Sequence, residues 1–481
     1  MNYKMMGKFL GTVLLIEAAL LTVPMAVALI YGESIMPYLL TVALLLPISV
    51  PTVFLTPKNK RIYAKDGFVC VALSWIFLSL FGAMPFIFSG AIPSFIDAVF
   101  ETVSGFTTTG ASILTDIECL PRGILFWRSF THWIGGMGIL VFMLALLSNL
   151  EGNAIFLMRA EVPGPQKGKL VPKLRESSML LYFIYLILTV AEVIALLIAG
   201  LPLYDSLINA FGTMGTGGFS VLNSSIGGYG NPAVEWIMAI FLLLAGVNYN
   251  IYYFLLVKKL RDVKKNDELK AYLLIIIASS AIIAVNLYKS MSAAYGALPD
   301  AIRAAFFQVV SVISTAGFTT DNFAAWPYLS QSVLFLLMFI GACAGSTAGG
   351  FKISRFIIML KGIKREVRKI FKPNSVQSLR LDGEVLDEKT VSSAMNYMSL
   401  YMIIMAISFV LVSFDGKDLI STVSAVVATF NNVGPGLGEA FSNFASFSDF
   451  SKIVLTLDML FGRLEIMPML VLITPAAWRK N

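Results

Sequence analysis

The sequence predicts an all-α polytopic membrane protein, and three observations support that prediction. Hydrophobic residues make up 57% of the 481-residue chain and charged residues only 14%, with a mean hydropathy of +0.79. Apolar blocks of about twenty residues recur, which is the length of a helix that crosses a bilayer. A short motif rich in Thr and Gly occurs four times between such blocks. We therefore expect four pseudo-symmetric helix–pore loop–helix repeats around one axis, preceded by an N-terminal two-helix pair.

Length and polarity place the boundaries of these units. The helix pair is expected at residues 1–66 and the repeats at 67–158, 176–265, 266–372 and 389–481. The ten predicted spans are 9–31, 36–55, 68–89, 124–148, 178–200, 233–257, 269–291, 331–360, 391–414 and 450–475. Each repeat also encloses a segment too short to cross a bilayer, which predicts half-helices at 95–106, 204–214, 300–314 and 418–431.

The distribution of Lys and Arg predicts the orientation, because short loops rich in these residues stay on the cytoplasmic side. Basic clusters follow the first helix pair and separate consecutive repeats, whereas 223–231 and 437–448 are nearly free of them. We expect both termini in the cytoplasm and the four motifs facing out. The net charge of +7 then reflects topology, and no nucleic acid is expected as a partner.

Several function classes are disfavoured by composition. The longest polar stretch, at about 361–389, is too short for a soluble domain, so nucleotide hydrolysis on this chain is not expected. Cys70, Cys119 and Cys343 lie far apart and suggest no disulfide framework. His132 is the sole histidine, which leaves little for a metal site or acid–base chemistry. We therefore do not expect an enzyme.

The repeated motif has the chemistry of a cation-selective loop. Its copies are Thr108-Thr109-Gly110, Thr216-Gly217-Gly218, Thr315-Ala316-Gly317 and Asn432-Val433-Gly434, with glycines 108, 99 and 117 residues apart. Backbone carbonyls can replace the water around a cation, and glycine permits the torsions that turn successive carbonyls inward. Non-helical backbone at membrane depth must line water or be buried in protein. The copies predict a selectivity filter in a central ion pore; the alternative is a set of packing turns.

These motifs resemble the four filters of the Trk/Ktr/HKT superfamily of potassium transporters. The similar stretches are SGFTTTGAS at 104–112, GTMGTGGFS at 212–220, STAGFTT at 314–320 and NNVGPG at 431–436. The additional N-terminal pair is similar to TrkH-type potassium uptake subunits more than to the eight-span Ktr type. Asn432 departs from the Thr of the other copies, which makes the side-chain contribution of the fourth copy asymmetric.

The resemblance implies properties that composition does not. It implies K⁺ as the transported ion, held at the filter residues, and no cofactor on this chain. It also implies a homodimer in the bacterial cytoplasmic (inner) membrane. A cytosolic TrkA-like nucleotide-binding ring subunit, which would carry ATP/ADP or NAD, is the implied partner.

A glycine-rich run interrupts the second span of the third repeat. The residues concerned are Gly341, Gly345, Ser346, Thr347, Gly349, Gly350 and, just beyond, Lys352. Such a run is a weak helix former, so 341–350 is either an unwound intramembrane loop or a close helix contact with small-xxx-small spacing. The resemblance implies that it is a gate under the filter. Lys352 either belongs to this gate or marks the cytoplasmic interface.

Arg463 lies in the middle of the last predicted span, where a lone cation costs roughly 2.5–3.5 kcal/mol on insertion scales. It should face the pore as an electrostatic barrier, or form an ion pair with Glu465 or Asp458. Residues two apart on a helix do not face each other, which argues against Glu465, and the resemblance implies an arginine that lines the pathway. Glu101, on the first half-helix, is expected to form hydrogen bonds behind the filter.

The four motifs predict an ion pore, and the resemblance implies that it serves potassium uptake across the cytoplasmic membrane, gated by the intramembrane loop and by a cytosolic regulatory subunit. Two alternatives stay open. One is a K⁺/H⁺ or K⁺/Na⁺ symporter of the same fold, which sequence does not separate from a channel. The other is a polytopic membrane enzyme, which lacks a recognisable nucleophile–base pair.

Overall fold

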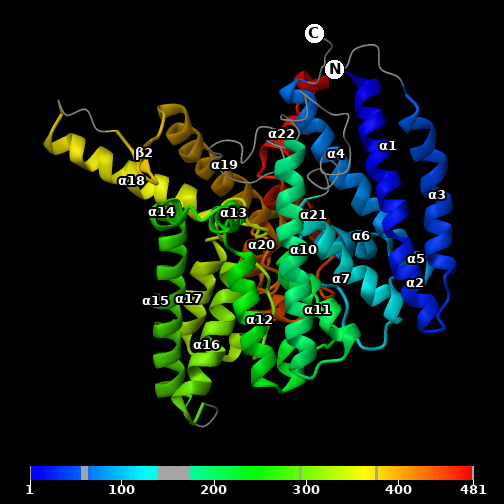
Figure 1. Ribbon diagram of the computed structural model, residues 1–481, viewed down its shortest axis with the longest axis horizontal. Coiled ribbons are helices and arrows are strands. Elements are labelled where there is room, and N and C mark those ends of the chain that lie inside the picture. Colours follow the sequence, from blue (N-terminus) through cyan, green and yellow to red (C-terminus); the bar gives the residue numbers. More distant parts are fainter. Residues whose placement is uncertain (1, 56–62, 139–173, 292–294, 374–377, 479–481) are drawn as a thin grey trace.

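The protein is a helical bundle with one short two-stranded hairpin, in a computed structural model that describes residues 2–55, 63–138, 174–291, 295–373 and 378–478. Figure 1 shows the long helices side by side, with both termini at the end of the bundle that also carries α14 (Leu260–Lys265). Six helices in the described part are long and apolar enough to cross a bilayer, and a bent pair could make a seventh span.

The side chains are distributed as expected for a bundle that faces lipid. On α15 (Asp267–Ser290), Leu274 and Ile277 are 67% and 66% exposed. By contrast, the side chains of Thr108 and Thr216 are fully buried in the interior. Apolar groups outside and polar groups inside are what a hydrocarbon solvent favours, since lipid offers no hydrogen bonds. The chain is therefore an all-α polytopic membrane protein.

The N-terminal helices form an antiparallel pair. α1 (Tyr3–Leu20) continues into α2 (Thr22–Ile30), and α3 (Met36–Val53) returns against α1. The pair approaches closely because a glycine faces the partner helix: a Cβ on Gly11 would lie 1.8 Å from Oγ1 of Thr52. The chain then continues through α4 (Ala64–Gly82), which packs on α1, and α5 (Met84–Phe88).

Four short helices become fully buried toward their C-terminal ends. They are α6 (Phe95–Phe106), α11 (Leu203–Gly215), α16 (Leu298–Ile313) and α20 (Leu419–Phe430). Each lies within two residues of its predicted bounds. The longest has 16 residues, or about 24 Å at 1.5 Å per residue, which does not cross a hydrocarbon core. At its start, α6 is capped by Ser94, whose hydroxyl accepts a hydrogen bond from the Asp97 amide.

The helical segments that follow these short helices differ from one another. They are α7 (Arg122–Gly136), α12 (Pro232–Ala245) with α13 (Tyr249–Leu256), α17 (Tyr328–Met338) with α18 (Ile353–Phe371), and α21 (Asp449–Arg463) with α22 (Met467–Ile473). Only the start of the predicted span 124–148 can be compared, because residues 139–173 lie outside the described part. The other three predicted spans are not continuous helices.

Each of the three interruptions has a different form. α12 and α13 meet at 89°, so the span predicted at 233–257 turns sharply. Between α17 and α18, residues 339–352 are non-helical. Between α21 and α22, the chain turns at Glu465 and Ile466, which have φ values of 56° and 65°. Positive φ is uncommon for a β-branched residue and is held only where the surroundings enforce it.

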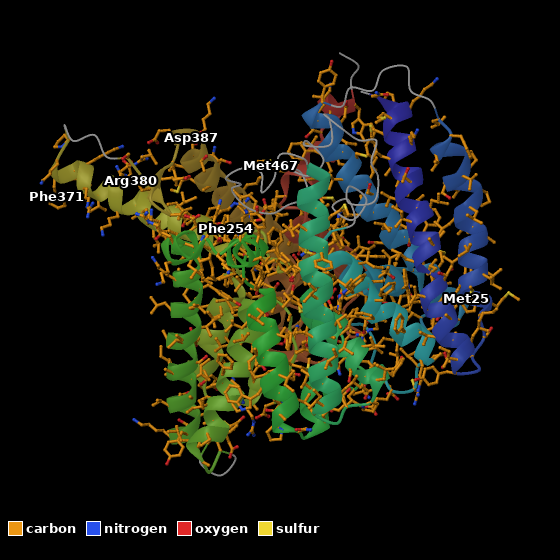
Figure 2. The ribbon with its side chains drawn as sticks, viewed as in Figure 1. Met25, Phe254, Phe371, Arg380, Asp387 and Met467 are labelled. Carbon is orange, nitrogen blue, oxygen red and sulfur yellow. The ribbon has the colours of Figure 1, made fainter. Side chains whose placement is uncertain are left out.

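The remaining elements complete the bundle and an arm that projects from it. The long helices α10 (Leu174–Ile198), α15 and α19 (Glu388–Val412) precede α11, α16 and α20. The 3₁₀ helices are η1 (Ser225–Tyr229), η2 (Phe323–Ala325), η3 (Ser413–Asp415), η4 (Gly438–Phe441) and η5 (Pro475–Trp478). Strands β1 (Arg380–Leu381) and β2 (Glu384–Val385) pair antiparallel with Arg380 opposite Val385. Figure 2 shows Phe371 and Arg380 on the arm formed by α18 and this hairpin.

Candidate functional site

The four motif copies form the same backbone turn at the ends of the short helices. Thr108, Thr216, Thr315 and Asn432 have φ values between 54° and 58°. In each copy the next amide bonds the carbonyl five residues back, as Thr109 does with Ser104 at 2.9 Å and Val433 with Ala428 at 2.8 Å. These bonds, with the i to i−3 bond of the preceding amide, define a Schellman helix end. Each turn therefore ends its helix and redirects the chain in the same way.

The glycines of the four turns close a ring. A Cβ added to Gly110 would lie 2.0 Å from the carbonyl oxygen of Gly217, one on Gly218 2.0 Å from that of Ala316, and one on Gly317 2.0 Å from that of Val433. The fourth contact returns to the start, because a Cβ on Gly434 would lie 2.5 Å from the oxygen of Thr109. We call Gly110, Gly218, Gly317 and Gly434 the glycine ring.

Only glycine fits these positions for two separate reasons. Its φ values in the ring run from 76° for Gly317 to 94° for Gly434, a region that residues with a Cβ adopt reluctantly. The adjacent backbone oxygen also leaves no space for a side chain. The backbone of four distant segments is thereby brought to one axis.

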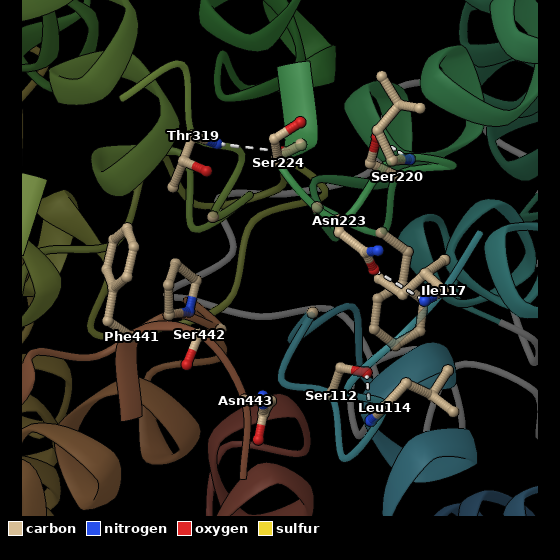
Figure 3. Close-up of a pocket in the computed structure, with 18 of the residues that line it drawn as sticks. Ser112, Leu114, Ile117, Ser220, Asn223, Ser224, Thr319, Phe441, Ser442 and Asn443 are labelled. Atoms are coloured by element: carbon tan, nitrogen blue, oxygen red, sulfur yellow. Dashed lines mark hydrogen bonds between the residues drawn. The ribbon is translucent and has the colours of Figure 1, made fainter. Parts of the chain in front are cut away.

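A cavity of about 580 Å³ opens on one side of the glycine ring. It is lined by all four glycines and by the segments that follow them, and Figure 3 shows Ser112, Asn223 and Asn443 around it. The amide of Asn223 donates a hydrogen bond of 3.0 Å to Asp116, which lowers the pKa of that carboxyl from its ordinary value. The cavity is therefore bordered by polar residues and by contacts between neighbouring loops.

Behind the first two turns, a buried polar cluster fixes the backbone. Glu101 accepts hydrogen bonds from the Arg128 guanidinium at 2.6 Å and the Ile113 amide at 2.9 Å. His132 contacts the Gly105 carbonyl through Nδ1 at 2.7 Å and accepts from the Phe219 amide through Nε2 at 3.3 Å. Glu101 therefore lies behind the turn, where the sequence predicts it, and His132 connects the first turn to the second.

Sequence reasoning missed the partners in this cluster. Arg128 lies 2% exposed within an apolar helix, and its guanidinium carbon is 3.4 Å from the centre of the Phe219 ring. The same argument that singled out Arg463, the cost of a cation in a span, applies to Arg128. A polar residue seven positions before the positive-φ residue also recurs in three copies, as Glu101, Asn209 and Gln308.

The non-helical 339–352 segment lies on the opposite side of the ring from the cavity. The Gly349 amide donates to the hydroxyl of Thr315, the first residue of the third turn, at 2.7 Å. The cavity, by contrast, is lined by Gly317 at the end of that turn. The prediction that 341–350 unwinds agrees with this backbone, and the alternative of a close helix contact does not.

The 339–352 segment is held by the bend in the second repeat. The Cys343 amide donates to the Gly246 carbonyl at 3.1 Å, and the Gly345 carbonyl accepts from the Tyr249 amide at 3.0 Å. Both partners lie beside the 89° bend between α12 and α13. Lys352, which is 1% exposed, donates to carbonyls of the segment itself, those of Ala348 and Gly349. Lys352 is therefore part of this segment and not of a solvated surface.

Arg463 lies where α21 ends, and not in the middle of a continuous span. Its guanidinium donates to the carbonyls of Thr347 at 2.6 Å, Gly135 at 2.6 Å and Gly136 at 2.7 Å. It also reaches the Thr108 hydroxyl at 3.4 Å. One cation thus joins the first turn, the 339–352 segment and the end of α7.

The acids considered as partners of Arg463 have other partners. Glu465 pairs with Arg355 at 2.5 Å. Asp458 accepts a hydrogen bond from the Ser408 hydroxyl at 2.6 Å. The structural role of these two carboxylates is therefore to join α21 and the turn after it to α18 and α19.

Asn432 occupies the threonine position of the fourth turn with the same backbone torsion. Its amide nitrogen donates to the Thr109 hydroxyl and to the Met459 carbonyl, both at 2.9 Å. The fourth turn is thus tied through its side chain to the first turn and to α21. The sequence motif alone identifies the position but not this cross-connection.

Comparisons with known proteins agree with this arrangement. The model of the TrkH family, described as cation transport protein, matches residues 39–480. The chain is 37% identical to the Trk system potassium uptake protein TrkH of Salmonella typhimurium, over 100% of both chains. It is 33% identical to TrkG of Escherichia coli, over 95% of this chain and 94% of the relative.

A solved structure extends the likeness to three dimensions. The crystal structure of the potassium transporter TrkH from Vibrio parahaemolyticus matches with a TM-score of 0.90 and 33% identity, over 100% of both chains. At this identity and coverage the similarity concerns the whole architecture and not a single motif. The chain belongs to the TrkH family of cation transport proteins.

Proposed function

We propose that this protein takes up K⁺ across the membrane through the glycine ring, along the electrochemical gradient of the ion. The observation that carries the proposal is the closed contact between each ring glycine and the carbonyl of the next copy. Backbone dipoles around one axis stabilise a dehydrated cation without the fixed charge that would trap it. The relatives named Trk system potassium uptake protein support K⁺ as the ion.

We assign the filter to the four turns, each together with its ring glycine. It consists of Thr108, Thr109, Gly110, Thr216, Gly217, Gly218, Thr315, Ala316, Gly317, Asn432, Val433 and Gly434. The units 67–158, 176–265, 266–372 and 389–481 would each contribute one turn, and 1–66 would support the first. The common torsions of the four copies favour this division, since the same turn is made at the same place in each unit.

The 339–352 segment is proposed as the gate, with Arg463 as an electrostatic barrier beside it. The contact between Gly349 and Thr315 supports a position directly at the inner end of the filter. The hydrogen bonds of Arg463 to Thr347 and to the first turn support a place for its charge in the same passage. A fixed positive charge in a passage of low dielectric opposes each entering cation.

The cellular setting follows from charge and from the family. Lys and Arg on α14 and α18 support a cytoplasmic location for that end of the bundle and for both termini. We place the protein in the bacterial cytoplasmic membrane as a homodimer. The words Trk system in the relatives' names favour a transport system with more than one protein component. We propose a cytosolic TrkA-like ring subunit that binds a nucleotide as the partner of this chain.

A reversal-potential measurement tests the proposed function. Purified protein in liposomes is exposed to opposed K⁺ and H⁺ gradients, and the potential at zero net flux is recorded. We expect it to follow the K⁺ gradient alone, because a pore of carbonyl dipoles couples no second ion. A potential that moves with the H⁺ gradient would instead identify a K⁺/H⁺ symporter of the same fold, and a second series with opposed K⁺ and Na⁺ gradients tests coupling to Na⁺. Liposomes without protein provide the background.

A further inference from the structure

The 339–352 segment is a closed loop whose two ends lie side by side. The Gly341 amide donates to the Phe351 carbonyl at 2.8 Å, and Gly341 and Lys352 form an isolated β-bridge. Whatever fixes these ends therefore also fixes the part of the loop that contacts Thr315 of the third turn. The attachment of the loop to the surrounding helices therefore decides the position of that contact.

Glu268 attaches the loop and the start of α18 to α15. One carboxylate oxygen, Oε1, accepts hydrogen bonds from the Ala344 amide at 2.7 Å and from the Ser354 amide at 2.9 Å. Glu268 is only 5% exposed. Both amides bond the same oxygen, so the carboxyl group holds them close to each other. A single side chain thus holds Ala344 within the loop and Ser354, the second residue of α18.

The bond to Ser354 also completes the start of α18. The first amides of a helix have no partner within the helix, and a carboxylate there is favoured by the helix dipole. Lys352, the N-cap residue of α18, directs its ammonium to Ala348 and Gly349. Glu268 therefore provides from another helix the acceptor that an N-cap side chain ordinarily supplies.

We propose that Glu268 is a positioning residue that holds the gate loop closed beneath the filter. This inference rests on the proposed role of the 339–352 segment as the gate. When Glu268 releases the Ala344 and Ser354 amides, the 339–352 segment separates from α15. Thr347 then loses its fixed position next to Arg463, and Gly349 loses its position next to Thr315. Opening is then a local event at one buried carboxylate.

The neighbouring residue connects this attachment to the projecting arm. Asp267 accepts hydrogen bonds from Lys361 of α18 at 2.9 Å and from the Asp382 amide of the β1–β2 hairpin at 3.3 Å. Lys361 also donates to the Arg380 carbonyl at 2.9 Å. A force on the hairpin therefore acts on the same turn of α15 that carries Glu268, which gives a cytosolic partner a route to the loop.

Cys343 is a native reporter of loop release, because it precedes Ala344 and its thiol is free and 0% exposed. The experiment uses full-length protein in liposomes in which Cys70 and Cys119 are replaced by Ala. The labelling rate of Cys343 by a water-soluble methanethiosulfonate and ⁸⁶Rb⁺ flux are measured in parallel. Glu268→Ala should raise the labelling rate about tenfold, because both hydrogen bonds to the carboxylate are lost.

Two variants separate this role from a general effect on stability. Glu268→Gln keeps an oxygen acceptor at the same reach and should stay within about threefold of the unmodified labelling rate. Glu235→Ala removes a partly buried acid that pairs with Arg303 on α16 and should leave Cys343 protected.

Lys361→Ala tests the connection to the arm. It should raise the labelling rate of Cys343 less than Glu268→Ala does, and no rise at all would overturn this connection.

The outcomes distinguish the inference from the proposed gate. Unchanged labelling in folded Glu268→Ala would overturn the role of Glu268. Faster labelling with unchanged ⁸⁶Rb⁺ flux would support Glu268 as the attachment and overturn the gate. If Glu268→Ala does not fold, Glu268→Asp is used in its place, because the shorter aspartate side chain does not reach both amides. Faster labelling of Cys343 in Glu268→Asp supports the inference. Labelling at the unmodified rate overturns it.

Discussion

The two sides of the proposed ion pathway differ in their symmetry. The four turns share one backbone geometry, with φ values of 54° to 58° at the first residue, and their glycines line the cavity. On the opposite side, the following segments differ: one bends by 89°, one is non-helical over 339–352, and one breaks at Glu465 and Ile466. Ion selection needs an equivalent contribution from every copy, whereas a gate needs only one copy to move. We infer that selectivity belongs to the symmetric side and control to the asymmetric side.

The largest expected effect comes from breaking the symmetric side at Gly317→Ser. A Cβ there would lie 2.0 Å from the Val433 carbonyl oxygen, so the ring must distort. We expect the preference for K⁺ over Na⁺ to fall by about tenfold, equivalent to ~1.4 kcal/mol. The measurement is the bi-ionic reversal potential of folded protein in liposomes.

The control for this variant is Gly90→Ser. Gly90 has a φ of 74°, close to the 76° of Gly317, but a Cβ there meets nothing within 4 Å. Its substitution therefore adds only the torsional strain of a left-handed residue, roughly 1–2 kcal/mol, and should leave ion preference unchanged. Equal selectivity in the two variants would contradict the assignment of the filter.

A deletion on the asymmetric side should change flux without changing selectivity. Removing residues 344–348 takes away the Thr347 carbonyl that accepts from Arg463 and shortens the proposed gate. We expect ⁸⁶Rb⁺ flux to rise about fivefold while the K⁺/Na⁺ preference stays within about twofold of wild type, because the carbonyl ring is unchanged. A folded deletion variant that conducts no faster would contradict the gate.

Arg463 lies between the two sides, and its replacement should have an intermediate effect. Arg463→Ala removes a positive charge from the proposed passage and should raise ⁸⁶Rb⁺ uptake about threefold per folded protein, whereas Arg463→Lys should stay near wild type. Uptake at or below wild type with normal folding would refute the barrier.

Arg128 is the matched control for Arg463, since both are buried arginines. Arg128 is paired with Glu101 at 2.6 Å, so Arg128→Ala leaves a buried carboxylate without its cation. We expect a loss of roughly 3–5 kcal/mol in the free energy of unfolding, seen as a lower yield of folded protein, and no rise in uptake. The same behaviour in both variants would show that Arg463 acts only in folding.

The smallest effect is expected when the fourth turn is made like the others. Asn432→Thr restores the threonine of the other copies at a φ of 55° but loses the hydrogen bonds to Thr109 and Met459. We expect selectivity to stay within about twofold and the melting temperature to fall by a few degrees, on the order of 1 kcal/mol per lost bond. A tenfold loss of selectivity would instead assign the Asn432 amide a direct part in ion binding.

The symmetric side could be predicted closely from the sequence. The short helices end at motifs that contain a glycine, and the positive φ of the ring glycines is visible in residue type. The positive φ of Thr108, Thr216 and Thr315 is not, because a β-branched residue disfavours it. For 341–350, weak helix propensity allowed unwinding but left a close helix contact equally open, and only the resemblance favoured the loop. The helix ends and the ring glycines depend on local backbone chemistry, which the sequence expresses directly.

The breaks in the other segments could not be predicted in this way. Hydropathy counts length and polarity, and it assigns the same span to a straight helix and to the bent pair of α12 and α13. Ile466 adopts a φ of 65° although its residue type disfavours it, so the surrounding packing decides the turn. The sequence shows Glu268 only as an acid next to the predicted span 269–291, and its bond to Ala344 depends on a segment 76 residues away.

The closed ring has a consequence for biosynthesis. The hydrogen bond from Asn432 to Thr109 spans 323 residues of sequence, and the last glycine contact also returns to Thr109. The first turn therefore leaves the ribosome long before the segment that completes its surroundings. Until the final repeat inserts, the three earlier turns present unclosed backbone at membrane depth, where unpaired polar groups are costly. A nascent chain cut short before Gly434 would thus be a natural substrate for membrane quality control.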